Sequence, residues 1–482
     1  MLDFRPVLHV IGLLLATLGL AMLVPAAVDV FAGSQDWQVF ASASLTTFFI
    51  GIGMFLSTRG APQDLDLRQA FLLTALSWVM IALFGSLPFI YAEMDLSVTD
   101  ALFESMSGIT TTGSTIITGL DTAPPGILMW RSLLQWMGGI GIIVMAVAVM
   151  PMLQVGGMQL FRMESSDNSE KILPRAAQIA GALALLYLCI TIVCAISLWA
   201  AGMSIFESVA HAMTSVATGG YSTSDQSIGH FDSASIDVIV TVFMVLGSLP
   251  FVLYLQALRG RPLMLWRDTQ VQWFFALATL AVFVMTLYRY VGGDVPILEA
   301  LRFTSFNIVS IMTGTGYAST DYGSWGGFAI GLFFLVMFVG GCAGSTSCGV
   351  KIFRIQVLFE TARRQIQHLL QPHGIFTPKF NDKPIPPAVR DAVMNFFFLF
   401  FGCFVVLALC LSAFGLDFIT AASGAGAALA NVGPGLGEII GPTGNYASLP
   451  DGAKWFLMIG MLLGRLELIG ILVLLSPTFW RG

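Results

Sequence analysis

The sequence predicts an all-α polytopic membrane protein, built from an N-terminal helical hairpin and four repeated units. Three observations carry this prediction. Charged residues make up only 10% of the chain, long apolar stretches recur along it, and four short apolar segments end in glycine turns. Soluble domains contain about 25% charged residues, so the low charge and the mean hydropathy of +0.83 exclude an ordinary soluble fold.

Ten apolar stretches are long enough to be membrane helices, which need about 20 apolar residues. Only helices and closed barrels satisfy their backbone in lipid, and these runs do not alternate with polar residues, so we expect helices. The first stretch is longer than the apolar core of a signal peptide, and we expect it to be retained. The expected spans are 7–31, 38–58, 70–91, 127–150, 176–201, 234–257, 271–292, 325–360, 391–414 and 453–478.

The two sides of the predicted helical body carry opposite charge. Loops after every second span are basic, with Arg59, Arg261 and Arg364 as examples, and they contain most of the 22 lysines and arginines. The positive-inside rule therefore places both termini in the cytoplasm. Acidic residues such as Asp225 and Asp321 gather on the opposite side, where an acidic vestibule would concentrate cations.

Four short apolar segments lie between pairs of expected spans, at 99–110, 204–217, 297–312 and 418–431. Each is too short to cross the bilayer and starts with signals of a helix N-terminus, such as Ser204 with Glu207. Their C-terminal ends would each bring a partial negative charge toward a shared cavity, which favours a cation. The expected organisation is a hairpin at 1–69 and repeats at 70–150, 172–260, 268–370 and 387–482.

Each short segment ends in a turn of small residues built around glycine. The turns read TTTGS at 110–114, ATGGY at 217–221, TGTGY at 313–317 and VGPGL at 432–436. A single glycine turn is weak support, but four at the same place in the unit and on the same face are not expected from unrelated loops. Because a ring of backbone carbonyls can replace the water shell of a cation, the turns predict a potassium-selective pore.

Five motifs resemble the Trk/Ktr/HKT superfamily of potassium transporters, and most of all its bacterial TrkH branch, over nearly the whole chain. They are SGITTTG at 107–113, ATGGYST at 217–223, GGCAGST at 340–346, NVGPGLG at 431–437 and GRLE at 464–467. The resemblance implies four helix–pore helix–helix repeats with pseudo-fourfold symmetry around one pore. It also implies a transport protein and not an enzyme.

The resemblance further implies one filter glycine in each turn, at Gly113, Gly220, Gly316 and Gly435. Carbonyls of the residues before them would coordinate the ion: Thr111, Thr112, Thr218, Gly219, Gly314, Thr315, Gly433 and Pro434. The implied cargo is K⁺, with Na⁺ and Rb⁺ as further candidates, and no cofactor is expected in this chain. The implied partners are a second copy of this chain, forming a homodimer, and a cytosolic nucleotide-binding ring of the TrkA type. The implied location is the bacterial inner membrane. Membrane lipid is expected around the chain, and nucleic acid is not.

The stretch 325–360 is too long for one span and is interrupted by small residues, which favour an irregular loop. The resemblance makes this loop an intramembrane gate, whereas close helix packing is the simpler alternative. The candidate gate residues are Gly340, Gly341, Gly344, Ser345, Thr346, Gly349, Lys351 and Arg465.

Arg465 lies near the middle of the last span, where an arginine costs about 2.5 to 3.5 kcal/mol. It is either one half of a structural ion pair or an electrostatic barrier beneath the filter. Glu467 lies on a different face of the expected helix and is not its expected partner. Arg131 and Gln135 could bond the pore loops, and His211 is expected to form hydrogen bonds within the second short segment rather than relay protons.

Two other kinds of protein were weighed against a potassium pore. A sodium- or proton-coupled secondary transporter with inverted repeats also uses broken helices at the membrane midplane. Such a transporter has one or two interrupted helices, whereas this sequence predicts four units that are interrupted at the same level. A haem-bearing membrane enzyme needs paired intramembrane histidines, and the five histidines do not provide them. The basic segment 351–390 could dock a regulator or contact anionic lipid.

Overall fold

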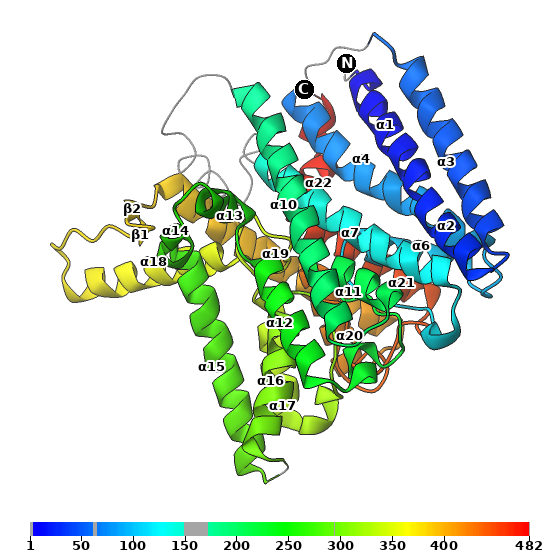
Figure 1. Ribbon diagram of the computed structural model, residues 1–482. Helices are drawn as coiled ribbons and strands as arrows, with labels where there is room; N and C mark the ends of the chain where they lie inside the picture. The colour runs from blue at the N-terminus through cyan, green and yellow to red at the C-terminus, as the bar shows by residue number, and fades with distance from the viewer. Residues whose placement is uncertain (1–2, 61–64, 149–171, 294, 482) are drawn as a thin grey trace.

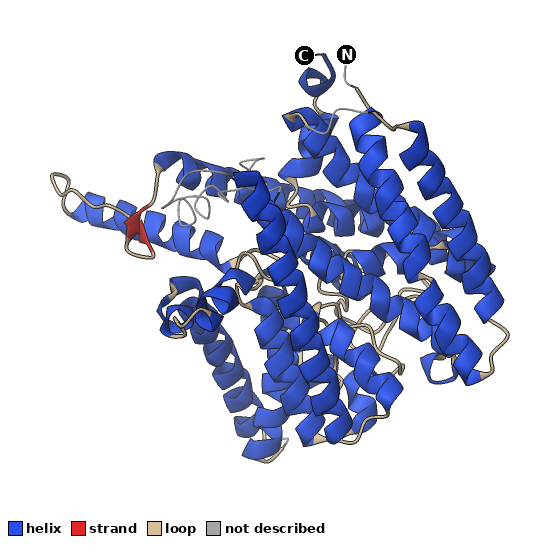
Figure 2. Cartoon of the chain, turned by 45° about the horizontal axis from the view of Figure 1, so that its top comes forward, coloured by secondary structure: helices blue, strands red, loops and turns tan. Residues whose placement is uncertain are grey.

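The chain folds almost entirely into helices in this computed structural model, which describes residues 3–60, 65–148, 172–293 and 295–481 (Figures 1 and 2). Within these residues the only sheet is a two-stranded antiparallel pair, β1 (Lys379–Phe380) with β2 (Lys383–Pro384). The end of the expected span 127–150 and the connection 151–171 lie outside the described residues. The all-α prediction is confirmed.

The N-terminal hairpin consists of α1 (Arg5–Ala21) and α2 (Leu23–Ala32), followed by α3 (Trp37–Ser57), which packs along both of them. Glycines let α1 and α3 approach closely: a Cβ on Gly51 would lie 2.5 Å from the backbone nitrogen of Ala16. Small residues at such contacts are typical of helix pairs in membranes. The first expected span is therefore present, but its helix breaks at Met22.

The same order of elements then occurs four times: a long helix, a short helix, a turn and a second helix. The first unit has α4 (Leu67–Gly85), α5 (Leu87–Tyr91), α6 (Val98–Ile109), η1 (Leu120–Thr122) and α7 (Pro125–Ala148). The second has α10 (Ile172–Ala200), α11 (Ile205–Val216), η2 (Ser227–Phe231), α12 (Ala234–Ser248) and α13 (Phe251–Leu258), followed by α14 (Leu263–Arg267). The third has α15 (Thr269–Val291), α16 (Ile297–Met312), η3 (Tyr322–Trp325), α17 (Gly327–Phe338) and α18 (Ile352–Leu370). The fourth has α19 (Pro387–Ala413), α20 (Phe418–Ala430), α21 (Asp451–Arg465), α22 (Ile469–Leu472), η4 (Val473–Leu475) and α23 (Pro477–Arg481).

The short helices α6, α11, α16 and α20 occupy the four predicted short segments, and side chains cap three of them. Ser204 and Glu207 form a capping box at the start of α11, as their spacing predicts. At α6 the cap is Ser97, two residues before the expected start. Burial opposes ionisation of Asp100, but its bonds to Lys454 and Ser97 outweigh this and lower its pKa. Hydrogen bonds from Thr420 lower the pKa of Asp417, the cap of α20.

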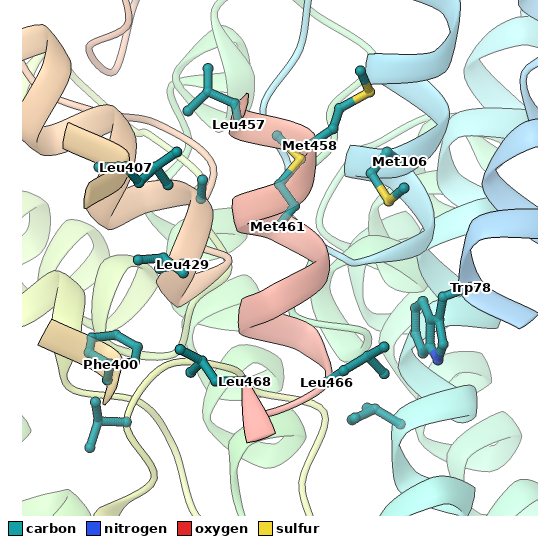
Figure 3. Packing of buried hydrophobic residues seen from close by; sticks show 14 of the residues in the cluster. Trp78, Met106, Phe400, Leu407, Leu429, Leu457, Met458, Met461, Leu466 and Leu468 are labelled. Atoms are coloured by element: carbon teal, nitrogen blue, oxygen red, sulfur yellow. The ribbon is translucent and has the colours of Figure 1, made fainter. Parts of the chain in front are cut away.

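The four units pack in a closed ring because the helix that follows the turn of each unit contacts the short helix of the next. Thus α7 packs on α11, α12 on α16, α17 on α20, and α21 returns to α6. Figure 3 shows the closing contact, with Met461 of α21 in the middle. Leu407 and Leu429 of the fourth unit lie on one side of it, and Met106 and Trp78 of the first unit lie on the other. One core therefore joins the first and fourth units.

Within the described residues, seven helices are long and apolar enough to cross a membrane, and α12 with α13 adds an eighth as a pair bent by 94°. The sequence predicts ten spans, and the difference lies in breaks within them. Stretch 325–360 is not helical between Phe338 and Ile352, and stretch 453–478 is interrupted between Arg465 and Ile469. Both termini lie on the same side of the molecule (Figures 1 and 2), and α18 with the β hairpin projects from the helical body.

A buried carboxylate connects the N-terminal hairpin to the first of the four units. Asp29 of α2 is fully buried and accepts a hydrogen bond of 2.7 Å from the backbone nitrogen of Gly126, in the first turn of α7. Backbone N–H groups in the first turn of a helix have no partner within that helix, and they attract a negative charge. Asp29 thus supplies a cap from outside the unit.

Replacing Asp29 with alanine should lower the melting temperature of the detergent-solubilised protein, because it leaves the Gly126 N–H buried without an acceptor. Such a loss costs about 1–3 kcal/mol. Asp29→Asn keeps an acceptor oxygen and should lose less. Glu93→Ala, at an exposed site, is the matched control. Equal melting temperatures for Asp29→Ala and the control would contradict the capping role.

Candidate functional site

The four glycine turns have the same backbone geometry. In each, a backbone N–H donates to the carbonyl five residues earlier, which ends the short helix with a tight reversal. These bonds join Thr112 to Ser107 (2.9 Å), Gly219 to Thr214 (2.8 Å), Thr315 to Ser310 (2.9 Å) and Val432 to Ala427 (2.9 Å). The residue before each donor is left-handed, with φ of 53° at Thr111, 51° at Thr218, 74° at Gly314 and 51° at Asn431. The residue after each donor is a glycine with positive φ: 87° at Gly113, 79° at Gly220, 81° at Gly316 and 100° at Gly433.

This geometry corrects the predicted frame of the fourth turn by two residues. Gly433, and not Gly435, occupies the position of Gly113, Gly220 and Gly316. Gly435 is not among the positive-φ glycines, and its N–H donates to the carbonyl of Ile440 at 2.7 Å. The sequence was ambiguous because two glycines flank Pro434. Asn431 decides the frame, since asparagine tolerates the left-handed conformation that ends α20.

The turns close on one another in a ring, each through a carbonyl oxygen that lies against a glycine of its neighbour. A Cβ on Gly113 would lie 2.2 Å from the oxygen of Gly219, and one on Gly220 would lie 1.8 Å from the oxygen of Thr315. A Cβ on Gly316 would lie 1.9 Å from the oxygen of Val432, and one on Gly433 would lie 2.6 Å from the oxygen of Thr112. Any side chain at these four positions would displace backbone, so only glycine fits.

A cavity of about 290 Å³ opens on one side of this ring. Its lining includes Gly113, Gly220, Gly316 and Pro434 together with hydroxyl groups of neighbouring serines and threonines. Among the described residues that line it, Asp225 is the only acidic one. The expected acidic vestibule is therefore mostly neutral at its floor, and carbonyl and hydroxyl oxygens dominate there.

Side chains from other elements fix the turns from behind. The amide of Gln135, from α7, donates to the oxygen of Gly219 (2.6 Å) and accepts from the nitrogen of Tyr221 (3.0 Å). Asn431 donates to Thr112 (2.9 Å) and to the carbonyl of Met461 (2.9 Å). The oxygen of Gly433 likewise accepts from the hydroxyls of Ser114 (2.9 Å) and Tyr446 (2.7 Å), so the Gly219 and Gly433 carbonyls already have partners within the protein.

On the other side of the ring lies the irregular loop that the sequence predicts within 325–360. Between α17 and α18 the chain closes on itself through a bridge that pairs Val339 with Val350. Gly344 and Gly349 adopt positive φ, at 74° and 72°, and Gly340 packs against the carbonyl of Cys348 so closely that a Cβ would lie 1.9 Å from it.

The loop touches three of the four turns directly. Ser347 donates to the carbonyl of Thr313 at 2.6 Å, and Thr346 lies 3.3 Å from the hydroxyl of Thr218. The hydroxyl of Thr111 lies 4.0 Å from the sulfur of Cys348. Gly341 donates to Ser347 at 2.9 Å, and Ser345 donates to the carbonyl of Cys342 at 2.5 Å, which stiffens the loop from within.

Arg465 ends α21 and binds this loop rather than a carboxylate. Its guanidinium lies 3.3 Å from the carbonyl of Thr346, 2.6 Å from the sulfur of Cys348 and 2.7 Å from the carbonyl of Gly138. Lys351 donates to the carbonyl of Ser347. The cavity bordered by the loop, Lys351 and Arg465 measures about 20 Å³, close to the space of one water molecule.

The neighbouring acid and the second-unit histidine have other partners. Glu467 lies just beyond the end of α21 and pairs with Arg354, so it is not the partner of Arg465, as expected. His211 is buried; its Nδ1 donates to the carbonyl of Glu207 (2.8 Å), so its Nε2 accepts from the hydroxyl of Ser222 (3.0 Å). Both nitrogens are engaged in fixed hydrogen bonds.

Short helices that end in glycine turns around one centre define a pore-loop membrane protein. The sequence model of the TrkH family, described as cation transport protein, matches residues 36–481. The chain is 46% identical over 479 residues to the Trk system potassium uptake protein TrkI of Halomonas elongata, covering 99% of this chain and 97% of the relative. It is 37% identical over 485 residues to the Trk system potassium uptake protein TrkH of Escherichia coli K12, covering 100% of both.

The fold matches the crystal structure of the potassium transporter TrkH from Vibrio parahaemolyticus with a TM-score of 0.92, at 37% identity and over 100% of both chains. This chain therefore belongs to the TrkH family, whose members named above are transport proteins and not enzymes. The resemblance of the five sequence motifs to this family is confirmed.

Replacing Asn431 should destabilise the ring in two separable steps. Asn431→Gly keeps the left-handed backbone but removes both amide bonds, whereas Asn431→Ala removes the bonds and adds about 1–2 kcal/mol of backbone strain. The melting temperature in detergent should therefore fall in the order wild type, glycine variant, alanine variant. Asn395→Ala, exposed on α19, serves as control. An alanine variant at least as stable as the glycine variant would refute this explanation.

Proposed function

We propose that this chain is the ion-conducting transmembrane subunit of a Trk-type potassium uptake system. The observation that carries the proposal is the ring in which each turn places a backbone carbonyl against the glycine of the next. Backbone without helical hydrogen bonds is tolerated at membrane depth only where protein or a water-filled cavity surrounds it. A ring of carbonyls beside a cavity satisfies that condition and suits an alkali cation.

The selectivity filter comprises the two residues before each ring glycine and the glycine itself. In the corrected frame the carbonyls belong to Thr111, Thr112, Thr218, Gly219, Gly314, Thr315, Asn431 and Val432, with Gly113, Gly220, Gly316 and Gly433 as filter glycines. Pro434 and Gly435 then lie beyond the fourth turn. K⁺ is the selected ion, and Rb⁺ and Na⁺ are candidates for weaker passage. No cofactor takes part.

The loop 340–349, with Lys351 and Arg465, acts as the gate. Its contacts with three turns and the small cavity beside it support a barrier directly below the filter. Arg465 holds the barrier closed by bonding the loop to α7 and placing a positive charge in the path of a cation. Gly340, Gly341, Gly344, Ser345, Thr346 and Gly349 give the loop its tight course and allow it to move.

The remaining assignments follow the family. The protein works as a homodimer in a bacterial inner membrane, with both termini in the cytoplasm and a TrkA-type nucleotide-binding ring as regulator. The four repeats are 70–150, 172–260, 268–370 and 387–482, after a hairpin at 1–69. Four quasi-equivalent turns argue against the alternative of a sodium- or proton-coupled inverted-repeat transporter, which would have twofold pairs of broken helices.

Purified protein in potassium-loaded proteoliposomes should take up radioactive rubidium, driven by the outward potassium gradient. The frame of the fourth turn predicts which glycine substitution lowers this uptake. Gly433→Ala places a Cβ 2.6 Å from the Thr112 oxygen at a φ of 100°, so we expect rubidium uptake to fall about tenfold or its ratio to sodium uptake to collapse. Gly435→Ala meets the flexible end of Ile440 and should be tolerated.

Two results would contradict these assignments. Absence of rubidium uptake by the unaltered protein would overturn the proposed function. Equal losses at Gly433 and Gly435 would overturn the frame.

Removing the Arg465 side chain should open the gate. Arg465→Ala breaks the bonds to Thr346, Cys348 and Gly138, so rubidium uptake without any regulator should rise several-fold, provided that the variant elutes as a folded protein. Arg481→Ala, in the exposed C-terminal helix, is the matched control. A folded Arg465→Ala variant with unchanged uptake would assign Arg465 a packing role only.

A further inference from the structure

Each short helix carries a polar side chain that reaches the segment that follows its own filter turn, called here the outgoing segment. Glu104, His211 and Asn307 each lie nine residues before the filter glycine of their unit. Each one bonds residues two or three positions after that glycine. In the fourth unit the equivalent residue is Gly424, and Ser423 next to it accepts from the nitrogen of Leu436 at 2.8 Å. Three turns thus share one brace position, the fourth turn has its brace one residue earlier, and the four braces are different chemical groups.

The second and third braces are neutral. His211 bonds the hydroxyl of Ser222 at 3.0 Å. Asn307 donates to the hydroxyl of Ser319 at 2.9 Å and accepts from the nitrogen of the same residue at 3.2 Å. Neither brace extends to a charged partner, so each holds its own outgoing segment with neutral hydrogen bonds.

The first brace is an ion pair. Glu104 is fully buried, and its carboxylate accepts 2.8 Å from Nε of Arg131, 2.9 Å from the nitrogen of Ile116 and 3.1 Å from the hydroxyl of Thr115. Among the described residues that brace the turns, this is the only pair of opposite charges. A buried pair is expensive to desolvate and is weak support for stability alone, so its presence points to a demand for exact geometry.

Arg131 carries the brace from the first turn to the second. Its Nη1 donates 2.8 Å to the carbonyl of Ser222, two residues after Gly220, and its Nη2 donates 3.0 Å to Thr115. The guanidinium also lies 4.1 Å from the centre of the Tyr221 ring. The rigid, planar guanidinium of Arg131 therefore joins the outgoing segments of two neighbouring turns.

The brace reaches the fourth turn through tyrosines. The hydroxyl of Tyr221 donates its single proton to the carbonyl of Glu104 at 2.9 Å and lies 3.2 Å from the carbonyl of Ser114. Tyr446 donates from its nitrogen to the carbonyl of Thr115 at 2.9 Å and from its hydroxyl to the carbonyl of Gly433 at 2.7 Å. Three of the four turns are therefore connected to one buried ion pair.

We propose that Glu104 and Arg131 are positioning residues that set the preference for potassium over sodium by preventing the carbonyl ring from contracting. Sodium is smaller than potassium, so carbonyls coordinate it well only where the turns can move inward. Charge-assisted hydrogen bonds are about twice as strong as neutral ones. Here they hold turns one and two in place, and the neutral bonds of Tyr446 connect the fourth turn to them. The inference rests on the proposed function, because it concerns the selectivity of that filter.

The test compares Arg131→Lys and Glu104→Gln with the unaltered protein in proteoliposomes, measuring rubidium uptake and its inhibition by sodium. Arg131→Lys keeps the charge but loses the fork, and Glu104→Gln keeps the shape but loses the charge. Both should lower the rubidium-to-sodium preference about tenfold, the factor for losing one hydrogen bond to a charged group. Loss of packing alone would lower total uptake of both ions and leave their ratio unchanged.

The chain offers a matched control in Asp100→Asn. Asp100 also lies on α6 and pairs with Lys454 of α21 at 2.6 Å, so it too ties two units together, but its described bonds reach no filter turn. The ratio should be unchanged in this variant. A ratio that falls equally in Asp100→Asn would overturn the proposal.

A neutral brace provides a second variant, should the charged pair prove essential for folding. Asn307→Ala removes only neutral bonds and should lower the ratio by about threefold or less. In detergent, potassium should raise the melting temperature of the unaltered protein more than sodium does, and this difference should shrink in every brace variant that folds. Folded brace variants with unchanged ratios and unchanged ion-dependent melting would overturn the proposal. Absence of uptake by the unaltered protein would instead overturn the proposed function.

Discussion

The structure depends on one constraint: a carbonyl oxygen of each turn occupies the space that a side chain would need on the neighbouring turn. The four contacts at Gly113, Gly220, Gly316 and Gly433 form a cycle, so no turn can be altered alone. Turns at membrane depth cannot rely on water to satisfy every backbone group. Mutual packing solves this problem and also forces the four units into cyclic order, with α21 returning to α6.

A ring made from one polypeptide need not be symmetric in its chemistry. The backbone repeats closely from turn to turn, but the groups behind it are a carboxylate with an arginine, an imidazole, an amide and a hydroxyl. Four identical subunits could not vary the braces in this way. The covalent linkage of the units allows each turn a different stiffness while the carbonyl geometry remains shared.

On the side of the ring that faces the loop between α17 and α18, a few polar contacts join the turns to the rest of the chain. The loop between α17 and α18 bonds the third turn through Ser347 and contacts the second through Thr346, and Arg465 attaches it to α7. These groups are buried, and breaking such contacts is costly unless replacements form. A rearrangement of the loop therefore also affects the base of the turns.

The sequence alone determined the helical membrane class, the four short helices to within a residue or two, and the presence of a glycine turn after each one. Apolar length, capping residues and glycine are local signals, so a single chain reveals them. Tertiary structure decided the fourth frame, where Asn431 and not the choice of glycine sets the turn, and it broke the helices at Phe338 and Arg465. It also brought Glu104, Arg131 and Tyr446 together, because partners so distant along the chain leave no periodic pattern and meet only when the ring closes.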